Sequence, residues 1–314
     1  MKSETDVQQR LEAACALAEA SLEGAFGERR TNWMNRLEAE HDNFASLLQD
    51  LLEQGAAEPG LRLTSLLQEL WFEAKYTAEG FDWLKRFLGL PAAQARTGLR
   101  ASGLDLAGAY ALNLGNYEEA RRLKEEALGI FRECGKPVEI AYTLFHLGHL
   151  SGFVQGDYAA AREFYEQGLD LLREACYKEG ITHGMANLGT AFAGLGAAAQ
   201  AAPLIAESLR CYRERGSVYN LGLSLRRAAI VAAGLGQAEA ALRLAAASDR
   251  QRSALGVSEP EVFSQAYACL LEPARRQLDE QSQSRLWAEG TMLSLDQAVD
   301  VALQVLSCPS IQAG

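Results

Sequence analysis

Apolar residues recur along this chain at helical spacing, and no segment shows the alternation of apolar and polar positions expected of a half-buried strand. Ala and Leu dominate the apolar set while Val, Ile and Thr are few, which favours helix over sheet. Before residue 91 the pattern predicts helices over residues 7–22, 29–54, 60–75 and 77–88. Near the C-terminus it predicts helices over 259–271 and 273–289. Ser294 and Gln297 have the spacing of a capping box that opens a last helix.

Between these flanks, four glycines stand at intervals of 41, 40 and 40 residues and predict turns between paired helices: Gly115, Gly156, Gly196 and Gly236. Self-similarity at such a period is typical of a solenoid, in which each helix pair buries its apolar face by stacking on its neighbours. We therefore predict an all-α protein, a solenoid of antiparallel helix pairs with about 40 residues per repeat; a resemblance to a repeat family, described below, implies that the solenoid is a right-handed superhelix.

Small residues recur at fixed distances from these turns. Seven or eight residues before each turn, on the first helix, come Gly108, Gly148, Gly189 and Ala229. Five and twelve residues after each turn, on the second helix, come Ala120, Ala161, Ala201, Ala241 and then Ala127, Gly168, Ser208, Ser248. Glycine inside a helix costs about 1 kcal/mol relative to alanine, so its recurrence implies close helix approach. We expect the last set to form a seam where one repeat leans on the next.

The second helices end in matching fashion. Three of them reach a glycine suited to the left-handed capping conformation, at Gly135, Gly216 and Gly256. Cys176 stands at the equivalent place in the remaining repeat, which predicts a differently built corner there.

No linker rich in Pro, Gly or Ser divides the 314 residues into separate compact halves. We predict one continuous solenoid in three parts. Residues 1–90 form helical pairs that lead into the array, residues 91–257 form four repeats, and residues 258–314 form capping helices.

Charge and cysteine usage exclude several classes of function. A formal charge of −11 argues against nucleic-acid binding, which depends on Lys and Arg neutralising phosphates. The six cysteines form no Cys-x-x-Cys pair, which is typical of a reducing compartment without a structural zinc site. The N-terminus lacks the apolar stretch of a signal peptide, and no segment has 18 uninterrupted apolar residues. We expect a cytoplasmic protein that contacts neither nucleic acid nor membrane.

No segment of the sequence matches a known catalytic or cofactor-binding motif in full. Residues 129–137 (GIFRECGKP) have five residues between the glycines where a phosphate loop has four, and Pro137 where Ser or Thr should bind magnesium. Residues 194–199 resemble a dinucleotide fingerprint but follow a helix and not a strand. His146, His149 and His183 fall on adjacent first helices, yet no carboxylate or thiolate completes a metal site. We predict no catalytic residue, no metal and no cofactor, although an acid–base pair among the 41 acidic side chains stays open.

These patterns carry a resemblance to a known family. Leu-Gly on the first helix, Gly-Asn-Tyr or Gly-Asp-Tyr at the turn and Ala early in the second helix resemble the tetratricopeptide repeat, whose usual length is 34 residues. The flanks, at residues 33–44, 70–72, 80–84, 286–290 and 293–298, resemble those of the array in large bacterial ATP-binding transcriptional regulators of the LuxR and AfsR types. In that family the array is a sensing arm attached to ATPase and DNA-binding modules, which this chain lacks.

The resemblance also implies a binding surface. In tetratricopeptide arrays the first helices line the concave face. The residues that face it are the second, fifth, sixth and ninth of each repeat, counted so that the glycine of the Leu-Gly pair is the eighth. Here those places are taken by Tyr142, Phe145, His146, His149, His183, Asn187, Thr190, Arg226 and Arg227. Aromatic, amide and cationic groups suit an extended peptide or an anionic small effector. The alternative is that Arg226 and Arg227 only pair with carboxylates of neighbouring second helices.

Two hypotheses about function follow. The favoured one is a non-enzymatic scaffold that binds a protein, peptide or small effector as the sensing arm of a bacterial regulator. The second is a stand-alone tetratricopeptide adaptor or peptide sensor that acts by protein–protein contact. A terminal helix lacks a stacking neighbour, which leaves a homodimer open as well.

Overall fold

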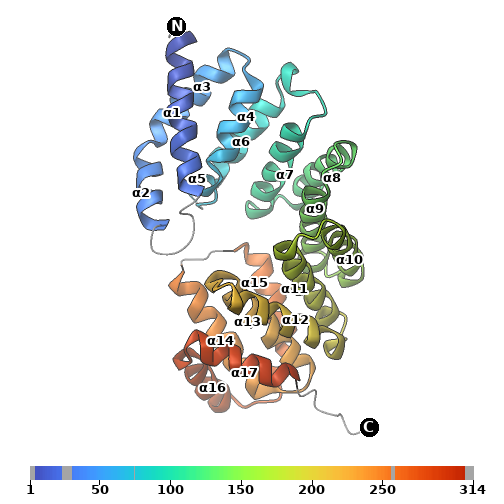
Figure 1. The fold of residues 1–314 in the computed structure, drawn as a ribbon. Coiled ribbons are helices and arrows are strands. Elements are labelled where there is room, and N and C mark those ends of the chain that lie inside the picture. The colour runs from blue at the N-terminus through green and yellow to red at the C-terminus, as the bar shows by residue number, and fades with distance from the viewer. Residues whose placement is uncertain (1–3, 23–29, 74, 256–258, 308–314) are drawn as a thin grey trace. The chain divides into compact units, whose positions relative to one another are not determined.

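The computed structural model describes residues 4–22, 30–73, 75–255 and 259–307, and all regular structure in these ranges is helical (Figure 1). The chain divides into two compact units, residues 1–136 and 137–314. Gly256 and Cys308 lie outside the described residues.

The first unit contains eight α-helices and one short 3-10 helix in its described part. They are α1 (Glu4–Leu22), α2 (Arg30–Ala39), α3 (His41–Glu53), α4 (Ala57–Leu66), α5 (Gln68–Trp71), α6 (Thr77–Leu88), η1 (Pro91–Ala93), α7 (Gly98–Asn113) and α8 (Tyr117–Glu133). Consecutive helices pack side by side, most extensively α7 on α8. Trp71 and Phe87 are fully buried in this unit.

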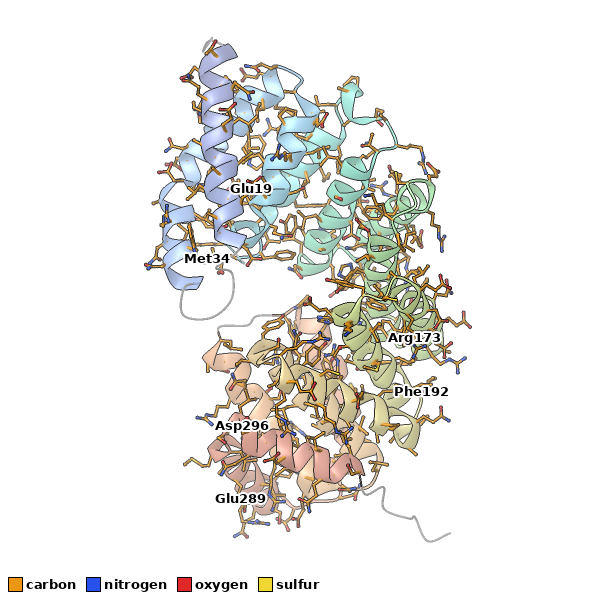
Figure 2. All side chains as sticks on the ribbon, in the orientation of Figure 1. Glu19, Met34, Arg173, Phe192, Glu289 and Asp296 are labelled. Carbon is orange, nitrogen blue, oxygen red and sulfur yellow. The ribbon has the colours of Figure 1, made fainter. Side chains whose placement is uncertain are left out.

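The second unit continues the pattern of helix pairs. Its elements are α9 (Pro137–His149), η2 (Leu150–Val154), α10 (Tyr158–Glu174), α11 (Lys178–Gly194), α12 (Ala198–Glu214), α13 (Val218–Gly234), α14 (Ala238–Ala254), α15 (Glu261–Arg275), α16 (Glu280–Met292) and α17 (Leu295–Ser307). Its core has two clusters of buried residues, and Phe192, labelled in Figure 2, packs against both.

The four regularly spaced glycines lie in turns between paired helices, as predicted. Gly115, Gly156, Gly196 and Gly236 all have φ between +72° and +78°, the left-handed region in which a residue with a side chain is strained. Each reverses the chain between the two helices of a pair, so the predicted 40-residue spacing of the turns is confirmed.

The corner at Cys176 is built like its glycine counterparts, so the prediction of a different corner was wrong. Cys176 itself adopts φ +53°, next to +62° at Gly135 and +63° at Gly216. The hydrogen bonds match too, because Tyr177 N donates to Leu172 O at 2.9 Å just as Ser217 N donates to Tyr212 O at 2.9 Å. The capping hydrogen bonds therefore hold the side chain in a conformation that it would otherwise avoid.

The glycines of the first helices lie where a large side chain of the second helix packs against them. A Cβ on Gly148 would lie 2.4 Å from the ring of Tyr165, and one on Gly189 would lie 2.6 Å from Ile205. A Cβ on Gly108 would lie 3.0 Å from the stem of Lys124. These three partners stand nine residues after their turn glycines, and the equivalent place in the last repeat is Ala245, opposite Ala229. A small residue is thus needed on one helix wherever its partner helix carries a large one.

At Gly168 and Ser248 the seam on the second helices packs within the helix pair, which corrects the prediction of contacts between repeats at these two places. A Cβ on Gly168 would lie 2.6 Å from Phe145 and 3.0 Å from the carbonyl oxygen of Ala141, both on the first helix of the same pair. Ser248 Oγ likewise donates to Gly222 O at 2.8 Å within the last pair. The small residues let the two helices of one hairpin approach closely.

The one irregular interval has a local cause. The first interval is 41 residues long, and the extra residue falls between Gly148 and Gly156, which are separated by seven residues where the equivalent positions of the other repeats are separated by six. This is where α9 widens into the π-helical turn η2, and Gln155 N donates to Leu150 O at 3.2 Å, five residues back. A π turn absorbs one inserted residue without breaking the helix.

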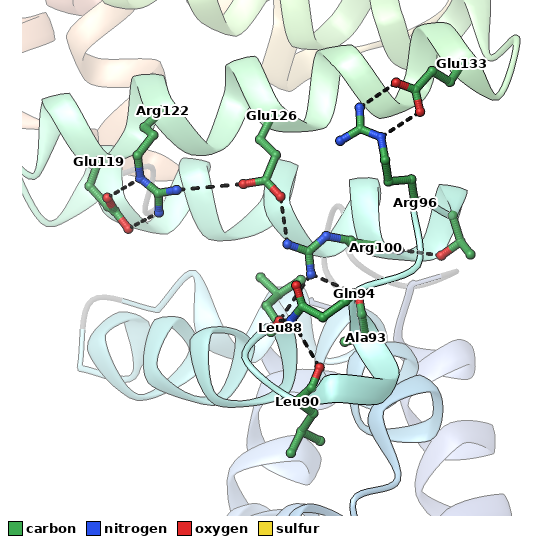
Figure 3. A network of polar contacts seen from close by, with 11 residues as sticks. Leu88, Leu90, Ala93, Gln94, Arg96, Arg100, Glu119, Arg122, Glu126 and Glu133 are labelled. Atoms are coloured by element: carbon green, nitrogen blue, oxygen red, sulfur yellow. Dashed lines mark hydrogen bonds and ion pairs between the residues drawn. The ribbon is translucent and has the colours of Figure 1, made fainter.

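A polar network fixes the start of α7 in the first unit (Figure 3). Arg100 donates to the carbonyl oxygens of Leu88 at 3.1 Å and Ala93 at 2.9 Å, and to Glu126 of α8 at 2.7 Å. Glu126 also lies 3.7 Å from Arg122. The network therefore satisfies carbonyl groups at the end of α6 and ties that end to the following helix pair.

Several predicted helix boundaries were wrong. The segment 29–54 is two helices with a break at Glu40: both pack on α1, but α2 also packs on α5 whereas α3 packs on α4 and α6. The segment 60–75 is likewise α4 and α5. Helix α15 runs through Pro273 to Arg275, and α16 begins only after Asp279, whose carboxylate accepts from Ser282 N at 2.7 Å. The capping box is confirmed: Ser294 N donates to Gln297 Oε1 at 2.9 Å and Gln297 N to Ser294 Oγ at 3.2 Å.

Candidate functional site

The first helices of the second unit, α9, α11 and α13, carry a line of polar and aromatic side chains. We call this line the first-helix surface and define it by Tyr142, His146, His149, His183, Asn187 and Arg227. All six were predicted as site residues, and all except Asn187 are half-buried. Three members lie on α9, two on α11 and one on α13, and the repeat length brings equivalent positions of these helices side by side.

A chain of hydrogen bonds joins these three helices. Arg227 Nη2 donates to Asn187 Oδ1 at 3.0 Å, and His149 Nε2 lies 3.3 Å from the same oxygen. Because a carbonyl oxygen can only accept, His149 donates through Nε2. Asn187 is only 5% exposed, so this amide acts as a buried link between its two neighbours.

Aromatic rings form a second line beside the polar one. The ring of Tyr142 lies 6.3 Å from that of His183, which lies 5.6 Å from that of Tyr212 on α12. Tyr142 is also 6.5 Å from Tyr177, which is 37% exposed. Stacked and edge-to-face rings of this kind offer a rigid apolar surface to a ligand.

The electrostatics of this surface favour neutral rings beside a guanidinium. Burial, and then the charges of Arg227 and Arg215, lower the pKa of His183 to about 4. Burial raises the pKa of Tyr212 to about 12, and burial followed by the neighbouring Tyr177 raises that of Tyr142. At neutral pH, therefore, His183 and the tyrosines are uncharged, and Arg227 supplies positive charge.

Two buried donors, one on this surface and one on the neighbouring helix α12, lack a hydrogen-bond partner. Arg227 Nε and the Tyr212 hydroxyl are both buried and unbonded. Buried polar groups are nearly always hydrogen-bonded. An acceptor group of a bound ligand would supply the partner that these two donors lack.

Three of the predicted residues lie elsewhere, which corrects their assignment to a lining. Phe145, 2% exposed, is part of the hydrophobic core, where it packs against Gly168 and Gly184. Thr190, also 2% exposed, donates to Ala186 O at 2.9 Å within its own helix. Arg226 pairs with Glu259 and lines a different part of the unit, between α13, α14, α15 and α16. Phe145 and Thr190 follow the family register but are directed inward by the close packing around the small residues.

The alternative of simple ion pairing holds for one arginine. Arg226 contacts a carboxylate, although Glu259 precedes α15 and is not on a second helix. Arg227 has an amide partner in Asn187 and no carboxylate partner within the described ranges.

Sequence reasoning missed the contribution of α15 to this region. Phe263 of α15 lies with its ring 6.1 Å from that of His149 and 4.9 Å from that of Phe153, and Tyr267 lies 5.1 Å from Phe153. Helix α15 thus packs across α13 and η2 and covers one end of the first-helix surface. The π turn places Phe153 there, and the longer first interval was the signal that could have indicated it.

Some features are absent from the described parts of the chain. In those residues no three His, Cys, Asp or Glu side chains group closely enough to hold a metal ion. No helix within the described ranges has the length and apolar character needed to span a membrane.

Comparison with known proteins identifies the repeat. A family model for the tetratricopeptide repeat matches residues 99–174, which run from α7 to the end of α10. No curated protein matches the chain. The prediction of an all-α protein built from tetratricopeptide-like helix pairs is confirmed.

The chain is also similar, at low sequence identity, to solved structures. BtubC (BKLC) from P. vanneervenii has a TM-score of 0.49 and 15% identity over 69% of this chain and 94% of its own. A kinesin light chain of Podosopora anserina with nearly identical TPR-like repeats has a TM-score of 0.43 and 15% identity, over 69% of this chain and 93% of its own.

Proposed function

We propose that this chain is a non-enzymatic scaffold that binds a protein or peptide on the first-helix surface of its second unit. The observation that supports this most directly is the continuous line from Tyr142 through His183 and Asn187 to Arg227, which spans three successive first helices. It combines half-buried rings with an unbonded guanidinium nitrogen.

The chemistry of the surface defines the peptide that fits. Arg227 can grip a carboxylate, and the rings of Tyr142 and His183 can pack against an apolar or aromatic side chain. Because the repeats place equivalent positions at regular intervals, an extended segment can contact several of them at once. We therefore expect an extended peptide with an acidic residue next to an apolar one.

We further propose that the scaffold is the sensing arm of a bacterial transcriptional regulator whose ATPase and DNA-binding modules lie outside this chain. The resemblance of the flanking segments, such as residues 33–44 and 286–290, supports this proposal. Occupancy of the first-helix surface would then shift the regulator between inactive and active states. A cytoplasmic location belongs to the same proposal.

A stand-alone adaptor is the second candidate, because the tetratricopeptide match alone fits both. The gene neighbourhood separates the two. A phosphate loop and a DNA-binding motif encoded in the same reading frame support the regulator, and a reading frame that holds only the repeats supports the adaptor. Self-association of the terminal helices stays a prediction.

Selection of disordered peptides from a displayed library tests the binding surface. We expect the selected peptides to carry Asp or Glu and to lose affinity about tenfold on Arg227→Gln, the effect of one charge-assisted hydrogen-bonded contact. Arg173→Gln is the matched control, because Arg173 is an exposed arginine on α10 and pairs with Asp170 at 3.1 Å (Figure 2).

Two outcomes would count against the proposal. Peptides whose affinity is unchanged by Arg227→Gln would place the contact on another surface. Equal losses for Arg227→Gln and Arg173→Gln would reduce the effect to net charge.

A further inference from the structure

The second unit contains a cavity that the first-helix surface does not include. It has a volume of about 390 Å³ and is lined by residues of α13, α14, α15 and α16, which pack together near the C-terminal end of the chain (Figure 1). Pockets of this size accommodate small molecules. Its walls include three arginines from three different helices, Arg226, Arg252 and Arg275, together with Tyr267 and Trp287.

Three residues that line the cavity already bind one carboxylate, that of Glu259, which itself is not a lining residue. Glu259 accepts from Arg226, from Arg252 Nη2 at 3.1 Å and from Ser264 Oγ at 2.5 Å. Its side chain is 14% exposed. Two guanidinium groups and a hydroxyl therefore bind a single carboxylate here, which shows that these side chains can bind an anion together.

Positive charge in the cavity exceeds what Glu259 neutralises. Among the described residues that line the cavity, the one carboxylate is that of Asp249, 3.7 Å from Arg252. Arg275 stands over the ring of Trp287, with its guanidinium carbon 5.8 Å from the ring centroid, and forms no ion pair with a described carboxylate. Three cations therefore face two carboxylates inside a chain whose formal charge is −11.

The cavity also leaves donor capacity unused. Arg252 is 11% exposed, and its Nε is buried without a hydrogen-bond partner. Tyr267 is 7% exposed and carries the guanidinium of Arg226 over its ring at 4.4 Å. An anionic group placed between Arg252 and Arg275 would satisfy the free donor and neutralise the excess charge.

We propose that this cavity binds a small organic anion in which a carboxylate or phosphate is attached to a planar group. Arg252 and Arg275 hold the anionic group, and the rings of Trp287 and Tyr267 contact the planar group. Glu259 competes from within the chain for the guanidinium of Arg252. The site is separate from the first-helix surface, because Arg227 does not line it.

Calorimetric titration of the full chain with phenyl phosphate and with benzoate tests this site, and neutral benzamide is the ligand control. We expect saturable binding of at least one anion and none of benzamide. Arg275→Gln should weaken anion binding about tenfold, since it removes a charge-assisted contact. Arg276→Gln is the matched control: Arg276 directly follows the last residue of α15, is exposed and pairs with Glu272 at 3.0 Å. It should leave the affinity within about twofold of wild type.

Glu259→Gln provides a test of opposite sign. Removing the internal carboxylate frees Arg252 and should strengthen anion binding several-fold, whereas a general loss of structure would weaken it. Helical circular dichroism checks that each variant is folded. Failure of both anions to bind, equal weakening by Arg275→Gln and Arg276→Gln, or weaker or unchanged binding by Glu259→Gln would each overturn the proposal. Peptide binding at Arg227 is expected to be unaffected by Arg275→Gln, so the two proposals can fail independently.

Discussion

At the scale of single residues, the chain stores backbone strain at a corner where a side chain replaces glycine. Cys176 adopts φ +53° in a conformation that its two counterparts, Gly135 and Gly216, adopt freely. The left-handed conformation costs an L-residue roughly 1–2 kcal/mol. The surrounding hydrogen bonds outweigh that cost, since the corner keeps the same pattern.

Cys176→Gly is therefore expected to stabilise the chain by up to about 1 kcal/mol, because the relief of strain is partly offset by the greater freedom of glycine in the unfolded chain. Gly216→Ala is the reverse change. A Cβ there meets no atom within 4 Å, so its expected loss of about 1 kcal/mol comes from the backbone alone. Urea unfolding followed by circular dichroism measures both. A loss of stability on Cys176→Gly would contradict the assignment of strain.

His183 links the candidate surface to pH. Its folded-state pKa of about 4 lies below the usual 6.5, so as pH falls the unfolded chain takes up a proton that the folded chain refuses. Stability is therefore lost as pH falls from about 6.5 to about 4, by on the order of 3 kcal/mol for a shift of this size. His183→Gln should remove that part of the pH dependence in urea unfolding, and His146→Gln should retain it. An unchanged slope in His183→Gln would show that His183 is not held neutral.

His41 in the first unit should behave in the opposite sense. Burial lowers its pKa, but hydrogen bonds to Glu79 at 2.8 Å and to Asp42 outweigh burial and raise it overall. Its contribution is complete below the unfolded pKa of about 6.5 and is lost as pH rises through the folded value. The two histidines therefore stabilise their units in different pH ranges.

At the scale of helices, the pairing of one small and one large residue controls how closely two helices approach. Gly148 with Tyr165, Gly189 with Ile205 and Ala229 with Ala245 occupy the same two places in successive repeats. The last pair shows that alanine is accepted on the first helix once the partner is also alanine.

Gly148→Ala should destabilise the chain by about 1–2 kcal/mol, because overlap with the buried Tyr165 ring exceeds the gain in helix propensity. With Tyr165→Ala in the background, the same change should become neutral or stabilising, a coupling of at least about 1 kcal/mol. Gly98→Ala at the start of α7 is the control, since a Cβ there meets nothing within 4 Å. Additive effects of Gly148→Ala and Tyr165→Ala would argue against the contact.

Features that depend on local backbone geometry could be predicted from the sequence, whereas contacts between distant segments could not. Turn glycines and small residues were visible because a fixed backbone geometry admits few residue types, and the capping box at Ser294 and Gln297 specifies its own hydrogen bonds. The register of the first helices placed Tyr142, His183 and Arg227 together for the same reason. The path of α15 could not be predicted, because its packing on η2 depends on contacts between Phe153 and Phe263, 110 positions apart in the chain.

At the scale of the whole molecule, the compact units do not follow the predicted division into residues 1–90, 91–257 and 258–314. The units meet at residues 136 and 137, whereas the tetratricopeptide match at residues 99–174 continues across that point. Compactness and repetition therefore describe different properties of the chain. The three-part division stays a proposal about repeats and not about units.

The second unit should fold alone as residues 137–314. Both of its core clusters, the line from His149 to Arg227 and the cavity around Arg252 lie entirely within it. Its 178 residues (137 to 314 inclusive) are enough to bury a core of their own. We expect the fragment to be helical by circular dichroism, to unfold cooperatively and to lose stability between about pH 6.5 and 4 because of His183. A fragment that is helical but lacks this pH dependence would mean that the environment of His183 requires residues before 137, and the assignment of the whole first-helix surface to one unit would then be wrong.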